Sequence, residues 1–239
     1  ARARNGNDRV TGQMNDRPNP LTPRLLIITF LLVVVAPFLP LLISQQWGWW
    51  QAWVYAVVTI AAFVVSRALA GRRNPELLAE RSRFMQQEDT QPWDRVLAPL
   101  AGLGGASIPL VAGLDARLGP PAGFSLAAEL TALALLIGGY LLASYALIEN
   151  AYFSGMVRIQ TDRGQQVVSS GPYRWVRHPG YAGALLAYLA TPFLLASPWA
   201  LLPALLLAVV LIIRTRLEDR TLHAELPGYA AYAQRVRYR

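Results

Sequence analysis

The chain has 239 residues, of which 54% are apolar and only 15% are charged. Soluble domains carry roughly a quarter charged residues, so this composition excludes a water-soluble or disordered protein and indicates a multi-pass membrane protein. The net charge of +8 comes from 22 arginines without any lysine. These arginines cluster beside the apolar runs, as in cytoplasmic loops, which favours membrane orientation over nucleic-acid binding. The chain has no cysteine, which excludes disulfides and thiolate zinc sites.

The first 150 residues predict a tail and four membrane-spanning helices. Residues 1–24 are polar and basic and predict a flexible cytoplasmic tail. Residues 25–150 contain three charge-free stretches long enough to cross a bilayer once or twice. The predicted spans are Leu25–Ile43, kinked or ended by Pro37 and Pro40, then about Gln51–Leu69, Val96–Leu114 and Phe124–Ile148.

The segments between these spans are polar or rich in turn residues. Residues 67–95 predict a cytosolic segment whose helix starts at Pro75 and lays Leu77, Leu78 and Phe84 on the bilayer surface. Residues 115–123 predict a short loop. The glycines at 102, 104 and 105 predict a close helix–helix contact.

The last apolar run, residues 179–213, is too short for two straight spans of about 20 residues each. Pro192, Ser197 and Pro198 near its middle predict a short helical hairpin. The resulting topology leaves only Arg117 outside the cell. The predicted fold is therefore an all-α, polytopic bundle of five to six membrane segments, in which the last two form a short hairpin and a cytosolic C-terminal helix caps a pocket.

The stretch GPYRWVRHPGYAG, residues 171–183, concentrates turn residues, aromatic rings and arginines. Pro179 suits the first position of a helix, so His178 is predicted at a helix N-terminus, where free N–H groups attract anions. Gly180 and Gly183 would let a flat ligand approach that helix. The alternative is an interfacial loop with snorkelling arginines and belt aromatics.

The stretch after the hairpin, residues 214–239, continues the final helix with alternating charges. Arg214 and Glu218 share a helix face, and Glu218 and Asp219 are adjacent acids at the membrane boundary, where acids are costly without a cation or ligand. The alternative is a salt-bridged juxtamembrane helix. With two histidines, His178 and His223, and no cysteine, no metal site is predicted.

Taken in order, GPYRWVRHPGY, the hairpin, R-x-x-x-E-D and GYAAY resemble the isoprenylcysteine carboxyl methyltransferase family of integral membrane enzymes, and bacterial members in particular. The resemblance covers residues 149–239. Membrane sterol reductases, which use NADPH, carry a similar RHPNY turn. Gly180 in place of their asparagine and the Glu218–Asp219 pair favour the methyltransferase.

The resemblance implies S-adenosylmethionine as cofactor and residues 151–239 as the catalytic, cofactor-binding region. It implies catalytic roles for Arg214, Glu218 and His178. It implies substrate contacts by Arg214, Glu149 and Asn150. The cofactor positions that it implies are Gln160, Gln165, Gln166, Val167, Val168, Tyr173, His178, Pro179, Gly180, Tyr181, Glu218 and Asp219.

The implied chemistry is methyl transfer to an amphipathic or lipid-like acceptor, with carboxylate O-methylation favoured. A carboxylate is already ionised and needs no general base, whereas an amine or thiol would need one, with His178 or Glu149 as candidates. The expected partners are the bilayer and that acceptor, with no nucleic acid and an open oligomeric state. The expected location is a bacterial plasma membrane, with both termini and the site on the cytoplasmic side. An NADPH-dependent enone reductase and a non-catalytic membrane adaptor are the alternatives.

Overall fold

The computed structural model describes residues 23–83, 87, 89–119 and 123–239. Helices make up 75% of these residues, and no strand occurs among them, so the all-α prediction is confirmed. Four helical segments in this part of the chain are long and apolar enough to cross a bilayer: Leu26–Ser44, Trp50–Arg73, Asp94–Leu118 and Leu126–Glu149. They match the four predicted spans. The predicted tail lies outside the described residues except for Pro23 and Arg24.

The first span is a continuous helix of three parts: α1 (Pro23–Phe30), one π-helical turn (Leu31–Val35) and α2 (Ala36–Ser44). Pro37 and Pro40 lie inside α2 and do not end it. The helix ends after Ser44, where Gln45 takes the left-handed conformation with φ 60°. α3 (Trp50–Arg73) then returns through the bilayer.

The segment between α3 and the third span contains α4 (Pro75–Ser82), which begins at Pro75 as predicted. Leu77 is fully buried in a cluster with Ala70 and Leu147. Its predicted position on the bilayer surface is therefore wrong, because the helix turns this side chain towards α3 and α6. Phe84 lies outside the described residues.

α5 (Asp94–Leu118) and α6 (Leu126–Glu149) form the third and fourth spans. α5 includes the first residues of the predicted 115–123 loop. Of the three α5 glycines, Gly104 faces Leu207 and Gly105 faces Tyr188, whereas Gly102 has open space around it. The predicted close contact therefore involves two of the three.

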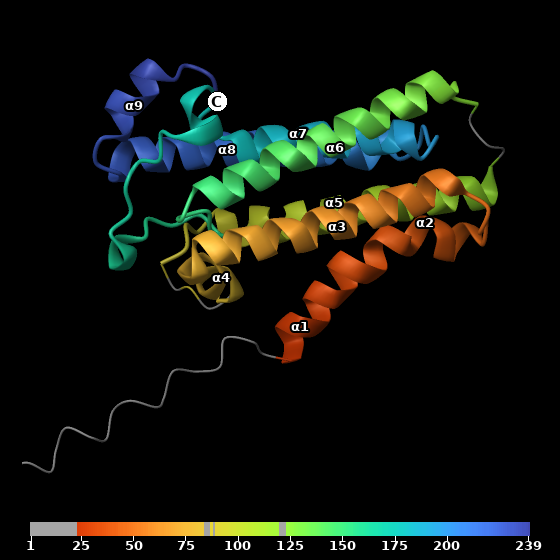
Figure 1. The fold of residues 1–239 in the computed structure, drawn as a ribbon, viewed down its shortest axis with the longest axis horizontal. Coiled ribbons are helices and arrows are strands. Elements are labelled where there is room, and N and C mark those ends of the chain that lie inside the picture. Colours follow the sequence, from red (N-terminus) through yellow and green to blue (C-terminus); the bar gives the residue numbers. More distant parts are fainter. Residues whose placement is uncertain (1–22, 84–86, 88, 120–122) are drawn as a thin grey trace, which may run out of the picture.

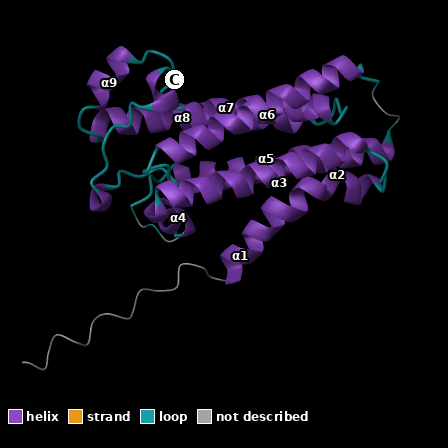
Figure 2. Ribbon diagram, viewed as in Figure 1, coloured by secondary structure: helices purple, strands orange, loops and turns teal. Residues whose placement is uncertain are grey.

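The predicted hairpin is present as α7 (Pro179–Leu194) and α8 (Leu201–Glu225), joined by a turn that contains Ser197 and Pro198. Ser197 anchors this turn to α5 by donating a hydrogen bond to Asp115 Oδ2 at 2.6 Å. α8 extends beyond its apolar part into the charged stretch, and α9 (Tyr229–Arg235) follows. Figures 1 and 2 show α7 and α8 antiparallel, with α9 at the end of the bundle where α7 begins.

Helix packing brings the ends of several spans to one place. α7 packs along α6, α3 packs on α6, and α5 packs on both α2 and α8 (Figure 1). The α6–α7 contact is close because two glycines face each other: a Cβ on Gly183 would lie 2.5 Å from the Gly139 carbonyl oxygen. Gly183 therefore serves helix packing, and its predicted role in admitting a flat ligand is wrong. The packing places the start of α7, the end of α6 and the charged end of α8 together.

Candidate functional site

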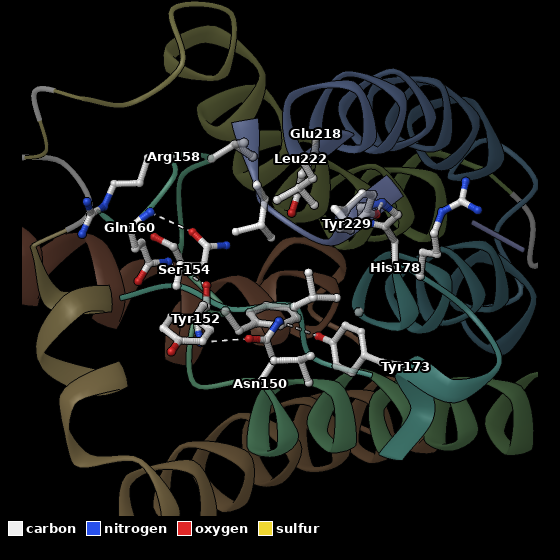
Figure 3. A pocket seen from close by; sticks show the side chains of 18 of the residues that line it. Asn150, Tyr152, Ser154, Arg158, Gln160, Tyr173, His178, Glu218, Leu222 and Tyr229 are labelled. Atoms are coloured by element: carbon white, nitrogen blue, oxygen red, sulfur yellow. Dashed lines mark hydrogen bonds between the residues drawn. The ribbon is translucent and has the colours of Figure 1, made fainter. Parts of the chain in front are cut away.

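A cleft lies at this end of the bundle, between the 150–168 loop, the start of α7, the charged end of α8, and α9 (Figure 3). It is lined by most of the residues that the sequence singled out. The predicted residues that line it are Asn150, Gln160, Gln165, Gln166, Val167, Val168, Tyr173, His178, Gly180, Tyr181, Arg214 and Glu218. Glu149, Pro179 and Asp219 were also predicted site residues, but they do not line it.

Other lining residues were missed by the sequence reasoning. They come from the loop, the end of α8 with the residue after it, and α9: Tyr152, Phe153, Ser154, Met156, Val157, Arg158, Leu222, Leu226, Tyr229 and Tyr232. Arg177, from the predicted 171–183 stretch, lines the cleft as well. Spacing did carry a signal for two of them, because Leu222 and Leu226 follow Glu218 at intervals of four residues and so share its helix face.

Glu218 is the acidic group of the cleft. Tyr181 donates a hydrogen bond to Glu218 Oε2 at 2.6 Å. The other carboxylate oxygen has no hydrogen-bond partner among the described residues. Figure 3 shows Glu218 and Leu222 on one side of the cleft and Asn150 and Tyr152 on the other. A single acid with one oxygen still able to accept hydrogen bonds suits a cationic or hydroxyl-bearing ligand.

Arg214 is fixed by an acid that the sequence did not reveal. Its Nε and Nη2 donate to the two oxygens of Asp94 at 2.6 and 2.9 Å, and Nη2 also donates to the Gly155 carbonyl at 2.9 Å. Asp94 is fully buried and also accepts from the Val157 N–H at 2.6 Å. Glu218 shares a helix face with Arg214 but does not hold its guanidinium. Asp94 occupies the bidentate edge of the guanidinium, which leaves Nη1 for a ligand.

Asp219 lies behind the cleft, and several side chains contact its carboxylate. It is 1% exposed and accepts hydrogen bonds from Arg177 Nε at 2.9 Å and from the Tyr229 hydroxyl at 2.9 Å. Arg239 Nε lies 2.9 Å from its other oxygen, and His178 Nε2 lies 3.2 Å from the first. Burial alone raises the pKa of Asp219, but the hydrogen bonds from His178, Arg177 and Tyr229 outweigh it and hold that pKa below its usual range. Asp219 orients His178 and Tyr229, which do line the cleft.

α9 and the residues after it are held over the cleft by the segment that precedes α7. Arg177 Nη1 donates to the Val236 carbonyl at 2.7 Å, and the Arg177 N–H donates to the Tyr238 carbonyl at 2.9 Å. Tyr232 donates through its hydroxyl to the Tyr173 carbonyl at 2.7 Å. Burial raises the pKa of Tyr232 to about 12, so this hydroxyl stays protonated and remains a donor. The rings of Tyr229 and Tyr232 are thereby placed against the cleft.

The 151–170 loop is organised by its own polar side chains. Gln160 is 1% exposed; its Nε2 donates to the Tyr152 carbonyl at 2.8 Å, and its Oε1 accepts from Arg163. Gln165 Oε1 accepts from the Gln160 N–H at 2.7 Å. Arg158 pairs with Glu80, Asp89 and Asp162 and so ties the loop to the α4 segment. Gln160 and Gln165 thus shape the wall of the cleft.

The side chains of Glu149 and Asn150, at the end of α6, have different surroundings. Glu149 pairs with Arg73 Nη2 at 3.0 Å and lies against Gly171, whose φ of +55° and close approach to Glu149 leave no room for a Cβ. Asn150 lines the cleft, donating to the Tyr173 hydroxyl at 3.2 Å and accepting from the Tyr152 N–H at 2.8 Å. Of these two residues, both predicted to contact the substrate, only Asn150 lines the cleft.

Gly180 packs against Phe153. A Cβ at Gly180 would lie 2.6 Å from two ring carbons of Phe153. Both residues line the cleft, so the missing side chain lets the ring close one wall against α7. This differs from the prediction, in which Gly180 makes room for a ligand directly.

The chain is similar to a known protein family and to a known bacterial protein. The family described as isoprenylcysteine carboxyl methyltransferase (ICMT) matches residues 128–224, which include α7, most of α8 and the loop between α6 and α7. An uncharacterized Bacillus subtilis (strain 168) protein, YpbQ, is 38% identical over 60 residues, which are 25% of this chain and 36% of that protein. The chain therefore spans about a third of that relative's length. The predicted family resemblance is confirmed over residues 128–224, and the four long apolar helices indicate a multi-pass membrane protein.

Proposed function

We propose that this protein transfers a methyl group from S-adenosylmethionine, bound in the cleft, to an amphipathic, lipid-like acceptor. The match of residues 128–224 to the isoprenylcysteine carboxyl methyltransferase family supports the proposal. The observation that carries the proposal is the convergence in the cleft of Asn150, His178, Tyr181, Arg214 and Glu218. They come from the end of α6, the start of α7 and the charged end of α8, three segments that lie far apart in the sequence.

The donor set of the cleft fits a sulfonium nucleoside. Glu218 provides negative charge, and the faces of Tyr181, Tyr229 and Tyr232 suit a cation. Val167, Leu222 and Leu226 form an apolar wall suited to a flat purine. The three arginines of the cleft, Arg158, Arg177 and Arg214, are each paired with an acid. The cleft therefore offers little free positive charge for the phosphates of NADPH.

When bound, S-adenosylmethionine supplies an electrophilic methyl group on a positively charged sulfur. The contribution of the protein is alignment and exclusion of water. Asp94 fixes the orientation of Arg214, and Tyr181 fixes that of Glu218. These two charged groups lie one turn apart on α8, just after its apolar part. A carboxylate acceptor is already ionised, so its methylation needs no proton removed and no general base.

We place the cleft on the cytoplasmic side of a bacterial plasma membrane. The support for this orientation is the distribution of arginine. Arg72 and Arg73 end α3, Arg95 begins α5, and Arg214–Arg239 follow the hairpin. Arg117 alone lies at the opposite end of a span among the arginines that the structure describes. Cytoplasmic loops carry such an excess of arginine.

Membranes that contain the protein test the proposal when incubated with methyl-labelled S-adenosylmethionine. Label is expected in a lipid-extractable product, and it should fall at least tenfold in Glu218→Gln. Glu225→Gln is the matched control, because Glu225 lies on the same helix, exposed and away from the cleft. Equal transfer by wild-type and Glu218→Gln membranes, or no transfer together with no binding of S-adenosylhomocysteine, would contradict the proposal. Binding of NADPH alone would replace it with the reductase.

A further inference from the structure

The α3–α4 hairpin places two arginines near one another. Gly71 on α3 faces Leu78 on α4, since a Cβ on Gly71 would lie 2.5 Å from Leu78 Cδ1. Residues three or four apart share a helix face, so Arg67 lies beside Gly71 and Arg81 beside Leu78, on the facing sides of the two helices. Burial, followed by repulsion from Arg67 and Arg214, lowers the pKa of Arg81 to about 9.

Neither arginine pairs with an acid in the part of the chain that the structure describes. Arg67 lies with its Cζ 4.7 Å from the centroid of the Phe63 ring. Arg81 donates from Nη1 to the Phe153 carbonyl at 2.9 Å, with its Cζ 5.6 Å from the centroid of the Phe153 ring. In contrast, the arginines of the cleft are ion-paired. A half-buried guanidinium with donors to spare, at the boundary of the bilayer, is stabilised by an anion that binds its planar fork.

Phe153 lies between this arginine pair and the cleft. Phe153 lines the cleft and packs against Gly180, while its carbonyl holds Arg81. On the other side, Val64 lies one turn before Arg67 on α3 and is 56% exposed, which offers apolar surface next to the charge. A positive site flanked by exposed apolar side chains on one side and by the cleft on the other suits an anionic amphiphile.

We propose that Arg67 and Arg81 bind the anionic head, a carboxylate or phosphate, of the acceptor, with its apolar chain along α3. The proposal rests on the proposed function and names the chemical class of its acceptor. The arginine pair also offers more hydrogen-bond donors to a ligand than Arg214 does. Asp94 occupies the bidentate edge of Arg214, so Arg214 alone offers one terminal nitrogen, whereas Arg81 uses only Nη1 in a hydrogen bond within the described residues.

The test is calorimetric binding of defined probes to the full chain in a neutral detergent. Dodecyl phosphate and dodecanoate are expected to bind saturably at one site, at least about tenfold more tightly than dodecanol, because a charge-assisted hydrogen bond contributes that much. Inorganic phosphate is expected to compete poorly. Equal binding of dodecanol would overturn the proposal, and so would competition by inorganic phosphate at the concentrations at which dodecyl phosphate binds, because the site would then hold any free anion.

Variants then locate the site. Arg67→Gln and Arg81→Gln should each weaken dodecyl phosphate binding about tenfold or more, Arg81→Lys less so, and Arg83→Gln not at all, since Arg83 is exposed at the end of the same helix. Unchanged affinity in both glutamine variants would overturn the proposal. Binding of S-adenosylhomocysteine by each variant shows that it is folded. If a variant does not fold, the selectivity of the wild-type protein for dodecyl phosphate over dodecanol still decides. Failure of the wild type to bind S-adenosylhomocysteine would overturn the proposed function, not the anion site.

Discussion

Substitution of Asp94 by asparagine tests the assignment of this carboxylate as the anchor of Arg214. The carboxylate is 0% exposed and accepts three hydrogen bonds, two from Arg214 and one from the Val157 N–H. Asparagine keeps the shape but removes the charge and turns one acceptor into a donor that faces Arg214. Removing one partner of a buried ion pair costs about 3–5 kcal/mol. We therefore expect Asp94→Asn to lose about 3 kcal/mol of unfolding free energy, which is a factor of more than about a hundred in the folding equilibrium.

The assay is unfolding in mixed micelles of a neutral detergent and SDS. Asp89→Asn serves as the matched control, because Asp89 is an exposed partner of Arg158 and its loss should cost less than about 1 kcal/mol. The double variant Asp94→Asn/Arg214→Gln should recover part of the loss, since no unpaired charge is then buried. A cost for Asp94→Asn no larger than that of Asp89→Asn would refute the argument. So would strict additivity in the double variant.

Two further substitutions test the walls of the cleft. Gly180→Ala should destabilise the protein by about 1–3 kcal/mol and weaken S-adenosylhomocysteine binding, because the new Cβ would lie 2.6 Å from the Phe153 ring. Gly138→Ala is the control, since Gly138 has open space around it in α6, and it should do neither. Equal effects of the two substitutions would contradict this packing. Asp219→Asn should lower thermal stability by a constant amount between about pH 5 and 8. Because the folded pKa of Asp219 lies below its unfolded value of about 3.9, its contribution is fully present above that pH and is lost as the pH falls through the folded pKa. Melting curves across pH should therefore show the difference from wild type narrowing below about pH 4, and a difference that widens in acid would be inconsistent with this role.

The order of the helices followed from local sequence patterns. Charge-free runs predicted the four spans, Pro75 marked the start of α4, and Ser197 and Pro198 marked the hairpin turn. The placement of His178 before α7 followed from the preference of proline for the first helical position. Each of these features is set by residues that lie close together in the sequence.

The partners of the charged groups did not follow from the sequence, because they are chosen by packing between distant segments. Asp94 and Arg214 are 120 residues apart in the sequence. Glu149 at the end of α6 pairs with Arg73 at the end of α3. Spacing placed Glu218 beside Arg214 on α8. In the folded protein, however, Glu218 accepts a hydrogen bond from Tyr181, and Arg214 donates to Asp94. Likewise, no local pattern showed that Tyr229 and Tyr232 would be folded back over the cleft by Arg177 and Tyr173.

Calorimetric titration of the detergent-purified protein with S-adenosylhomocysteine tests most directly whether the cleft is a sulfonium-nucleoside site. The account predicts binding of one molecule per chain, weakened at least tenfold by Glu218→Gln and unchanged by Glu225→Gln. No heat of binding to the wild-type protein, or the same affinity in wild type and Glu218→Gln, would contradict it.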